Sequence, residues 1–124
     1  MTPLISIVSP AFDESEALGP FLATLRATLA PLEDRFRFEI LIVDDGSQDT
    51  TPDVMAGECQ RDPRVSYLRL SRNFGHQAAL TAGLSRARGE CVVSLDADLQ
   101  HPPALMADML RLWEEGFSVV DTRR

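Results

Sequence analysis

Residues 38–47 read FEILIVDDGS, and this stretch decides the fold class. Its first six residues are apolar except for Glu39, which is typical of a strand that has helices packed on both faces. Two acids, a glycine and a serine follow at once, and these residue types build turns. The stretch therefore predicts a buried parallel strand that ends in a polar loop, as in an α/β protein.

Outward from this stretch, short apolar runs alternate with segments of helical spacing. We expect further strands at residues 4–9, 65–70 and 91–95, with a fifth strand beginning at 117–120. We expect helices at residues 18–29, from 52 onward, at 77–87 and after 103. The pattern predicts a single domain over residues 1–124 with a three-layer α/β/α fold and a mainly parallel, Rossmann-like sheet.

Prolines mark the expected ends of these elements. Pro10 is expected to stop the first strand, because proline has no N–H for a sheet ladder. Pro20 is expected near the start of the first helix, where its missing N–H costs least. Pro52 is expected to begin the second helix, with Thr50 or Thr51 as the cap.

Composition excludes several classes of protein. The 124 residues carry a net charge of -7, with 12 arginines and no lysine. No basic run exceeds Arg123–Arg124, so broad nucleic-acid binding is not expected. No apolar run approaches the ~20 residues that a membrane span needs, and no basic leader or signal peptide precedes the first strand, so we expect a cytoplasmic location. Cys59 and Cys91 are isolated and are expected to be reduced packing residues.

Polar loops follow three of the predicted strands, at residues 10–14, 44–51 and 96–103. In an open parallel sheet, ligands bind in the crevice beyond the carboxyl ends of the strands. These loops are therefore the candidate binding site, and their joint occurrence on one sheet edge favours a ligand over turn construction alone.

Asp96 and Asp98 form a D-x-D motif directly after the fourth predicted strand. Carboxylates at positions i and i+2 of extended chain project to the same side and can address one divalent cation. Mg²⁺ and Mn²⁺ prefer such oxygens, and a substrate diphosphate would complete the coordination. The alternative is structural: one Asp caps the following helix and the other is a solvated turn residue.

Asp44 and Asp45 follow the second strand and have a similar ambiguity. Gly46 permits positive φ, and Ser47 and Asp49 can accept hydrogen bonds from backbone N–H groups, so turn construction explains part of this loop. Adjacent carboxylates repel each other unless donors lie between them, and the ribose hydroxyls or base N–H groups of a nucleotide are suitable donors. We therefore assign Asp44 and Asp45 to nucleotide binding.

Taken together, four strings resemble the N-terminal half of a glycosyltransferase family 2 enzyme with the GT-A fold. The resemblance is strongest to the bacterial polyprenyl-phosphate branch, which is similar to dolichol-phosphate mannosyltransferase, and it covers essentially all 124 residues. The strings are SIVSP with FDE at residues 6–14, IVDDGS at 42–47 with Asp49 and Thr51, SRNFG at 71–75 with Ala78–Ala79, and DADLQ at 96–100 with Pro102–Pro103.

The resemblance implies roles for residues at the nucleotide end of the site. It implies that Pro10, Phe12 and Glu14 line the nucleotide pocket and that Asp45 accepts hydrogen bonds from the base. Asp13 departs from the family pattern, which usually has Asn at this position. An amide offers donors as well as an acceptor, so we expect this change to alter loop bonding more than chemistry.

The resemblance also implies a metal end. Asp96 would lie near the ribose and the metal, and Asp98 would coordinate the Mg²⁺ or Mn²⁺ ion that bridges the diphosphate. These two residues would act in catalysis through the metal. Gln100 matches a position near the metal and the sugar phosphate in the polyprenyl-phosphate branch.

The implied reaction is metal-dependent transfer of a sugar from a UDP- or GDP-sugar to an acceptor, either polyprenyl phosphate or a saccharide. A hydroxyl acceptor needs a general base, which in this family lies on a later segment that the chain lacks. A phosphate acceptor is already an anion and needs only cations that position it. Arg123–Arg124 match a place where the branch often has arginines, although a solvated charged terminus explains them equally well.

The resemblance predicts that the chain is a truncated piece that ends as a fifth strand begins. We expect the complete protein to associate with the inner face of the cytoplasmic membrane. In the piece, the fourth or fifth strand would be an unpaired sheet edge through which two copies could dimerise.

Rival functions remain open at this stage. The chain is alternatively a non-catalytic module that binds a nucleoside diphosphate and a metal. An aspartate phosphotransferase would use Asp13 as its nucleophile, and a nucleotidyltransferase would need a glycine-rich, basic first loop that is not present. Either His76 or His101 could contact a phosphate, but the family pattern requires histidine at neither position, and for both we expect surface or packing roles.

Overall fold

The computed structural model describes residues 2–97 and 103–116, with the backbone alone for 103–105. The described chain forms one sheet of four parallel strands, in the order β3-β2-β1-β4. The strands are β1 (Leu4–Ala11), β2 (Arg37–Asp44), β3 (Val65–Arg69) and β4 (Cys91–Ser94). The parallel α/β architecture is confirmed, and the predicted strand at 117–120 lies outside the described residues.

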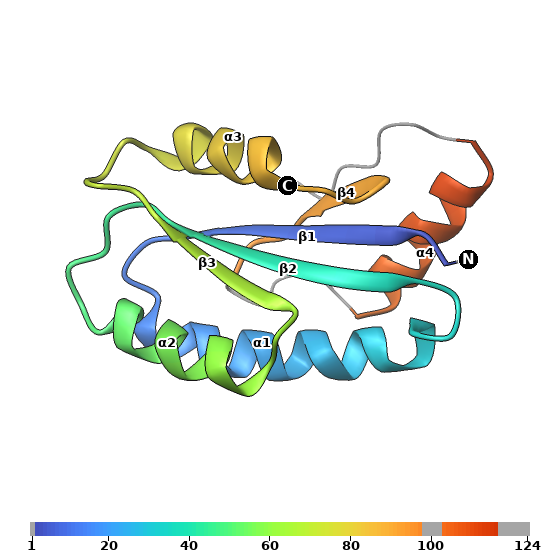
Figure 1. Cartoon of the computed structure of the whole chain (residues 1–124), viewed down its shortest axis with the longest axis horizontal. Helices are drawn as coiled ribbons and strands as arrows, with labels where there is room; N and C mark the ends of the chain where they lie inside the picture. The colour runs from blue at the N-terminus through green and yellow to red at the C-terminus, as the bar shows by residue number, and fades with distance from the viewer. Residues whose placement is uncertain (1, 98–102, 117–124) are drawn as a thin grey trace.

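Helices cover both faces of this sheet (Figure 1). They are α1 (Ser15–Leu29), the short 3₁₀ helix η1 (Ala30–Leu32), α2 (Thr51–Arg61), α3 (His76–Arg86) and α4 (Pro103–Glu114). The buried side chains of α1, α2 and α4 share one core, whereas α3 packs on the opposite face. Of the helices in the described ranges, none has the length and apolar character needed to cross a membrane.

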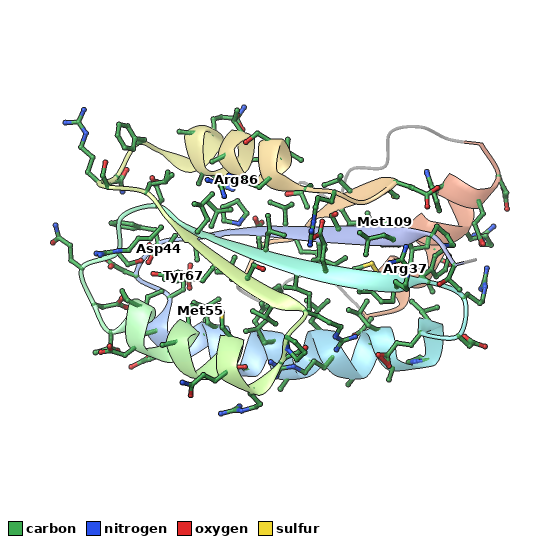
Figure 2. All side chains as sticks on the ribbon, in the orientation of Figure 1. Arg37, Asp44, Met55, Tyr67, Arg86 and Met109 are labelled. Carbon is green, nitrogen blue, oxygen red and sulfur yellow. The ribbon has the colours of Figure 1, made fainter. Side chains whose placement is uncertain are left out.

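The apolar side chains of β2 pack against helices on both faces of the sheet. Ile40 and Ile42 face the larger core, which also receives Met55 from α2 and Met109 from α4 (Figure 2). Leu41 and, beside it, Val43 face α3. Because side chains alternate along a strand, a strand covered on both faces needs apolar residues at successive positions.

Helix α3 lies very close to the sheet at Gly83. A Cβ built on Gly83 would lie 2.4 Å from Cγ1 of Val8 and 2.9 Å from Cγ2 of Val43. Real Cβ atoms do not approach other carbons so closely, so the absence of a side chain at this position sets the distance between α3 and the strands.

Pro10 does not stop β1, which continues to Ala11. Residues of a parallel strand bond to the neighbours on either side in turn, and the Val8 carbonyl accepts from the Leu95 N–H on the β4 side. Pro10 faces that same side and has no N–H to donate, so the pairing with β4 ends at Ser94 while the pairing with β2 continues to Ala11. Strands β1 and β4 therefore part at the point where the binding loops begin.

Pro20 also lies elsewhere than expected. Helix α1 begins at Ser15, so Pro20 lies inside the helix rather than in its first turn. Its missing N–H leaves the Glu16 carbonyl without its helical donor. Both residues are exposed, so water can satisfy this carbonyl, and the helix tolerates the proline.

An ion-pair cluster ties α1 and α2 to the start of β3. The Asp62 carboxylate accepts hydrogen bonds from Nε of Arg26 at 3.0 Å and from Nε of Arg64 at 3.2 Å. Arg26 also donates through Nη2 to Glu58 at 2.7 Å. Burial raises the pKa of Asp62, but the hydrogen bonds from Arg64 and Arg26 outweigh it and lower that pKa to about 2.

Candidate functional site

The strand order places a switch point between β1 and β4. The chain passes from β1 through β2 to β3, then crosses back to form β4 on the other side of β1. Ligands of open α/β sheets bind in the crevice at such a point, beyond the carboxyl ends of the strands. A pocket of about 350 Å³ lies there, lined by Pro10, Ala11, Phe12, Glu14, Asp45, Asn73, Gly75, His76, Ala79, Asp96 and Ala97.

The pocket brings together several residues that the sequence assigned to the site. Pro10, Phe12 and Glu14 come from the loop after β1, Asp45 from the loop after β2, and Asp96 from the loop after β4. Asp98 and Gln100 lie outside the described residues, as do His101 and Arg123–Arg124.

Asp44 is not among the described residues that line the pocket. Its side chain is fully buried and accepts hydrogen bonds from the Ser47 N–H, at 2.7 Å, and from the Tyr67 hydroxyl (Figure 2). Nε of Arg69 lies 3.9 Å from the same carboxylate. Burial and the neighbouring Asp44 raise the pKa of Tyr67. The two adjacent acids are therefore used differently: Asp44 builds the turn, and Asp45 faces the pocket.

Asp45 joins two loops. The residue is 5% exposed, and its carboxylate accepts hydrogen bonds from the backbone N–H of Phe74 at 2.8 Å and of Gly75 at 3.0 Å. The next residue, Gly46, has a φ of 78°, and a Cβ there would lie 2.4 Å from the carbonyl carbon of Arg72. The loop after β2 thus holds the loop that leads into α3, and a side chain at Gly46 would push the two apart.

Asp13 shapes the loop after β1 from outside the described pocket lining. It has a φ of 50°, a conformation in which Asp and Asn are the most tolerated side chains after glycine. Its N–H donates to Oγ of Ser47, and its Oδ1 accepts from the Gln48 N–H, both at 2.8 Å. Asn would supply the same acceptor, so both loop bonds could form with either residue, and the expected change in loop bonding does not arise from these two bonds.

Asp49 supplies the side-chain acceptor at the start of α2. Thr50 occupies the N-cap position, as one of the two predicted threonines, but it makes no side-chain capping bond, and Oδ1 of Asp49 accepts instead from the Thr51 N–H at 2.9 Å. Hydrogen bonds from the Thr51 hydroxyl and N–H, and from Ser15, hold the pKa of Asp49 at about 2. Oγ1 of Thr51 also accepts from the Glu14 N–H at 3.1 Å, which fixes the backbone that presents Glu14 to the pocket.

Asp96 and His76 meet at the β4 side of the pocket. Asp96 follows β4, and its side chain is 44% exposed. His76 is the first residue of α3, and its Nε2 lies 3.9 Å from Oδ1 of Asp96. His76 is exposed, which agrees with the surface position that the sequence favoured, and it also lines the pocket.

The described residues could bind a hard cation such as Mg²⁺ only if a bound ligand supplied the remaining oxygen atoms of its coordination shell. No group of three or more His, Cys, Asp or Glu side chains that could hold a metal occurs in the described part of the chain. Asp96 supplies an accessible carboxylate there, and Mg²⁺ is typically bound through one or two carboxylates plus substrate phosphates. The site fits a metal that shares its coordination with a diphosphate, and the sequence offers Asp98 as the second carboxylate.

Sequence reasoning assigned no site residue to the loop between β3 and α3 and weighed a phosphate contact only for His76, yet this loop and the start of α3 contribute Asn73, Gly75 and His76 to the pocket. Gly75 has a φ of 104°, so this glycine permits the turn into α3. The string SRNFG was part of the family resemblance, and its glycine before a helix was the available signal of a loop with a defined shape.

Comparison with known proteins decides the family. The sequence model described as Glycosyl transferase family 2 matches residues 6–124. The chain belongs to this family. Its relatives include the glycosyltransferase YkcC of Bacillus subtilis, 39% identical over 93% of this chain and 35% of the relative. A second relative is the undecaprenyl-phosphate 4-deoxy-4-formamido-L-arabinose transferase of Pseudomonas syringae, 39% identical over 97% of this chain and 35% of the relative.

Solved structures of glycosyltransferases share the fold. The mannosyltransferase PcManGT of Pyrobaculum calidifontis, solved with GDP-Man and Mn²⁺, has a TM-score of 0.75 at 24% identity, over 90% of this chain and 32% of that one. Staphylococcus aureus TarS 1-349 with UDP-GlcNAc has a TM-score of 0.73 at 22% identity, over 93% of this chain and 32% of that one. These matches assign the described sheet and helices to the GT-A fold. The chain spans 35% to 38% of the length of the curated relatives it matches.

Proposed function

We propose that this family 2 chain is the donor-binding part of a metal-dependent glycosyltransferase that moves a sugar from a UDP- or GDP-sugar to polyprenyl phosphate. One observation carries the proposal: the pocket at the switch point gathers Phe12, Glu14, Asp45 and Asp96 from three separate strand ends. The undecaprenyl-phosphate transferases among the relatives support the acceptor class, and the GDP-Man and Mn²⁺ bound by PcManGT support the donor and the cation.

The nucleoside would occupy the side of the pocket formed by the loops after β1 and β2. Phe12 is 42% exposed and, with Pro10, offers an apolar surface for the ribose and base. Glu14 can accept hydrogen bonds from ribose hydroxyls. Asp45 can accept a base N–H as well, because each carboxylate oxygen has a second lone pair beyond the one that its backbone N–H partner occupies.

The diphosphate would lie toward Asp96. Asp96 and, from the sequence, Asp98 would hold Mg²⁺ or Mn²⁺, with Gln100 near the sugar phosphate. When bound, the cation stabilises the negative charge that develops on the departing diphosphate. The residues of the chain would place the donor so that its anomeric carbon is open to the acceptor.

The acceptor determines what else the reaction needs. A polyprenyl phosphate oxygen is already anionic and attacks the anomeric carbon without a general base, so the donor-binding part supplies most of the chemistry. A saccharide hydroxyl would need a base from a later segment. Because the chain spans about a third of its relatives, a second candidate is a module that binds donor and metal without transfer. Association with a membrane and dimerisation through a sheet edge stay predictions.

Calorimetric titration tests the proposal. UDP and GDP are titrated into the protein in Mn²⁺, and we expect one of them to bind and the Asp96→Asn variant to lose most of that binding. Asp108→Asn on α4 is the matched control, because its exposed carboxylate lies outside the pocket lining. If neither UDP nor GDP binds, the proposal is overturned. Turnover of the matching sugar nucleotide with undecaprenyl phosphate then separates the transferase from the binding module.

A further inference from the structure

His76 is the one side chain able to carry positive charge among the described residues that line the pocket. The same lining contains three carboxylates, those of Glu14, Asp45 and Asp96. A diphosphate in this pocket therefore meets mainly acidic groups, and its oxygens need hydrogen-bond donors as well as a cation. Of the described lining side chains, only Asn73 and His76 can donate from nitrogen.

The position of His76 is fixed by the backbone rather than by packing of its ring. Gly75, directly before it, donates its N–H to Asp45 at 3.0 Å and accepts through its carbonyl from Ala79 at 3.1 Å. These bonds hold the first turn of α3 against the loop after β2. The imidazole itself is 54% exposed, so it has room to contact a ligand.

The imidazole ring also lies at the Asp96 end of the pocket, where the diphosphate is proposed to bind. Its Nε2 is 3.9 Å from Oδ1 of Asp96, so both groups address the same region. An exposed pair at this separation stabilises the fold little, which gives the contact no strong structural purpose. As the first residue of α3, His76 also lies where the partial positive charge of the helix N-terminus favours anions.

We propose that His76 is a substrate-contacting residue that donates a hydrogen bond to the diphosphate and so makes the pocket select nucleoside diphosphates over nucleosides. The inference rests on the proposed function and adds a specificity residue to it. It does not depend on the charge of the ring, because a neutral imidazole still has one N–H to donate. Asp45 acts in this contact as a positioning residue, since it holds the turn that delivers His76.

A series of shortened ligands tests the inference. The affinities of nucleoside, nucleoside monophosphate and nucleoside diphosphate are measured in Mn²⁺ for the wild type, His76→Ala and His76→Lys. We expect His76→Ala to weaken diphosphate binding by about tenfold or more, the usual effect of losing a hydrogen bond to a charged group. Nucleoside binding should change less than twofold, and His76→Lys should recover much of the diphosphate affinity.

The control is Gln77→Ala, an exposed neighbour on α3 that is not in the described lining. Equal weakening of nucleoside and diphosphate by His76→Ala would mean a purely structural role and overturn the inference, as would unchanged affinity for every ligand. If the wild type binds no nucleoside diphosphate, the proposed function fails instead, so the two failures are distinguishable.

Discussion

Removal of the Asp45 carboxylate should release the loop that leads into α3. Asp45→Ala deletes the acceptor of two hydrogen bonds, from Phe74 at 2.8 Å and Gly75 at 3.0 Å. A hydrogen bond to a charged group contributes about 1.5–3 kcal/mol, so the loss of both lowers the free energy of opening this loop by at least about 3 kcal/mol, the lower end of the range. Asp45→Asn keeps one acceptor oxygen and should lose about half as much.

Amide hydrogen exchange measures this opening directly. A loss of about 3 kcal/mol corresponds to roughly 100-fold faster exchange at Phe74 and Gly75, and the Asn variant should give about tenfold. Exchange in the middle of β2 should change little if the loop opens without global unfolding. Asp108→Ala on α4 is the control for loss of a carboxylate at an exposed position.

Unchanged exchange at Phe74 and Gly75 in Asp45→Ala would refute the reasoning, because it would mean that other contacts hold the loop. Equal acceleration throughout the sheet would also refute it, since Asp45 would then support the whole fold rather than this loop. A nucleotide titration of the same variants should show weaker binding, because Asp45→Ala both opens the loop and removes an acceptor for the base.

Two further predictions concern stability. Gly83→Ala should lower the free energy of unfolding by about 1–2 kcal/mol in urea denaturation, because overpacking against Val8 and Val43 outweighs the better helix propensity of alanine. The control Gly57→Ala, whose new Cβ would have nothing within 4 Å, should instead raise the free energy of unfolding by about 0.5–1 kcal/mol. A stabilising Gly83→Ala would contradict the close packing of α3. The pKa of Asp62, lowered from 3.8 to about 2, predicts that its contribution of about 2 kcal/mol is complete above pH 4 and is lost as the pH falls toward 2; Asp62→Asn should remove that part of the pH dependence, and an unchanged acid profile would argue against the ion-pair cluster.

Much of the fold could be predicted because the sequence pattern is local. The continuous apolar run before Asp44 requires cover on both faces, and this condition follows from alternation along a strand. The prediction for Pro10 was correct that proline has no N–H to donate to a neighbouring strand, but wrong that it would end β1. A missing N–H affects only the neighbour that it faces, and the sequence does not say which neighbour that is.

The site could be predicted only in part, since it depends on strand order. The loops after the first and fourth strands meet because β1 and β4 are adjacent, and the loop with His76 joins them because α3 returns over β1. Nothing in the spacing of Asp44 and Asp45 distinguishes their roles. The Tyr67 hydroxyl of β3 donates a hydrogen bond to Asp44, whereas Asp45 lines the pocket, and this contact between distant parts of the sequence distinguishes the two acids.

Paramagnetic broadening by Mn²⁺ tests the central claim, that this pocket binds a nucleoside diphosphate together with a divalent cation, most directly. Backbone amide signals are recorded with substoichiometric Mn²⁺, with and without UDP or GDP. We predict that the nucleotide makes Mn²⁺ broaden the amides of His76, Asp96 and Ala97 first, while Arg37 and Glu90, at the amino-terminal ends of β2 and β4 and so at the opposite end of the sheet, stay sharp. Broadening centred on the acidic loop around Asp13 and Asp49, or broadening that does not depend on nucleotide, would contradict the account.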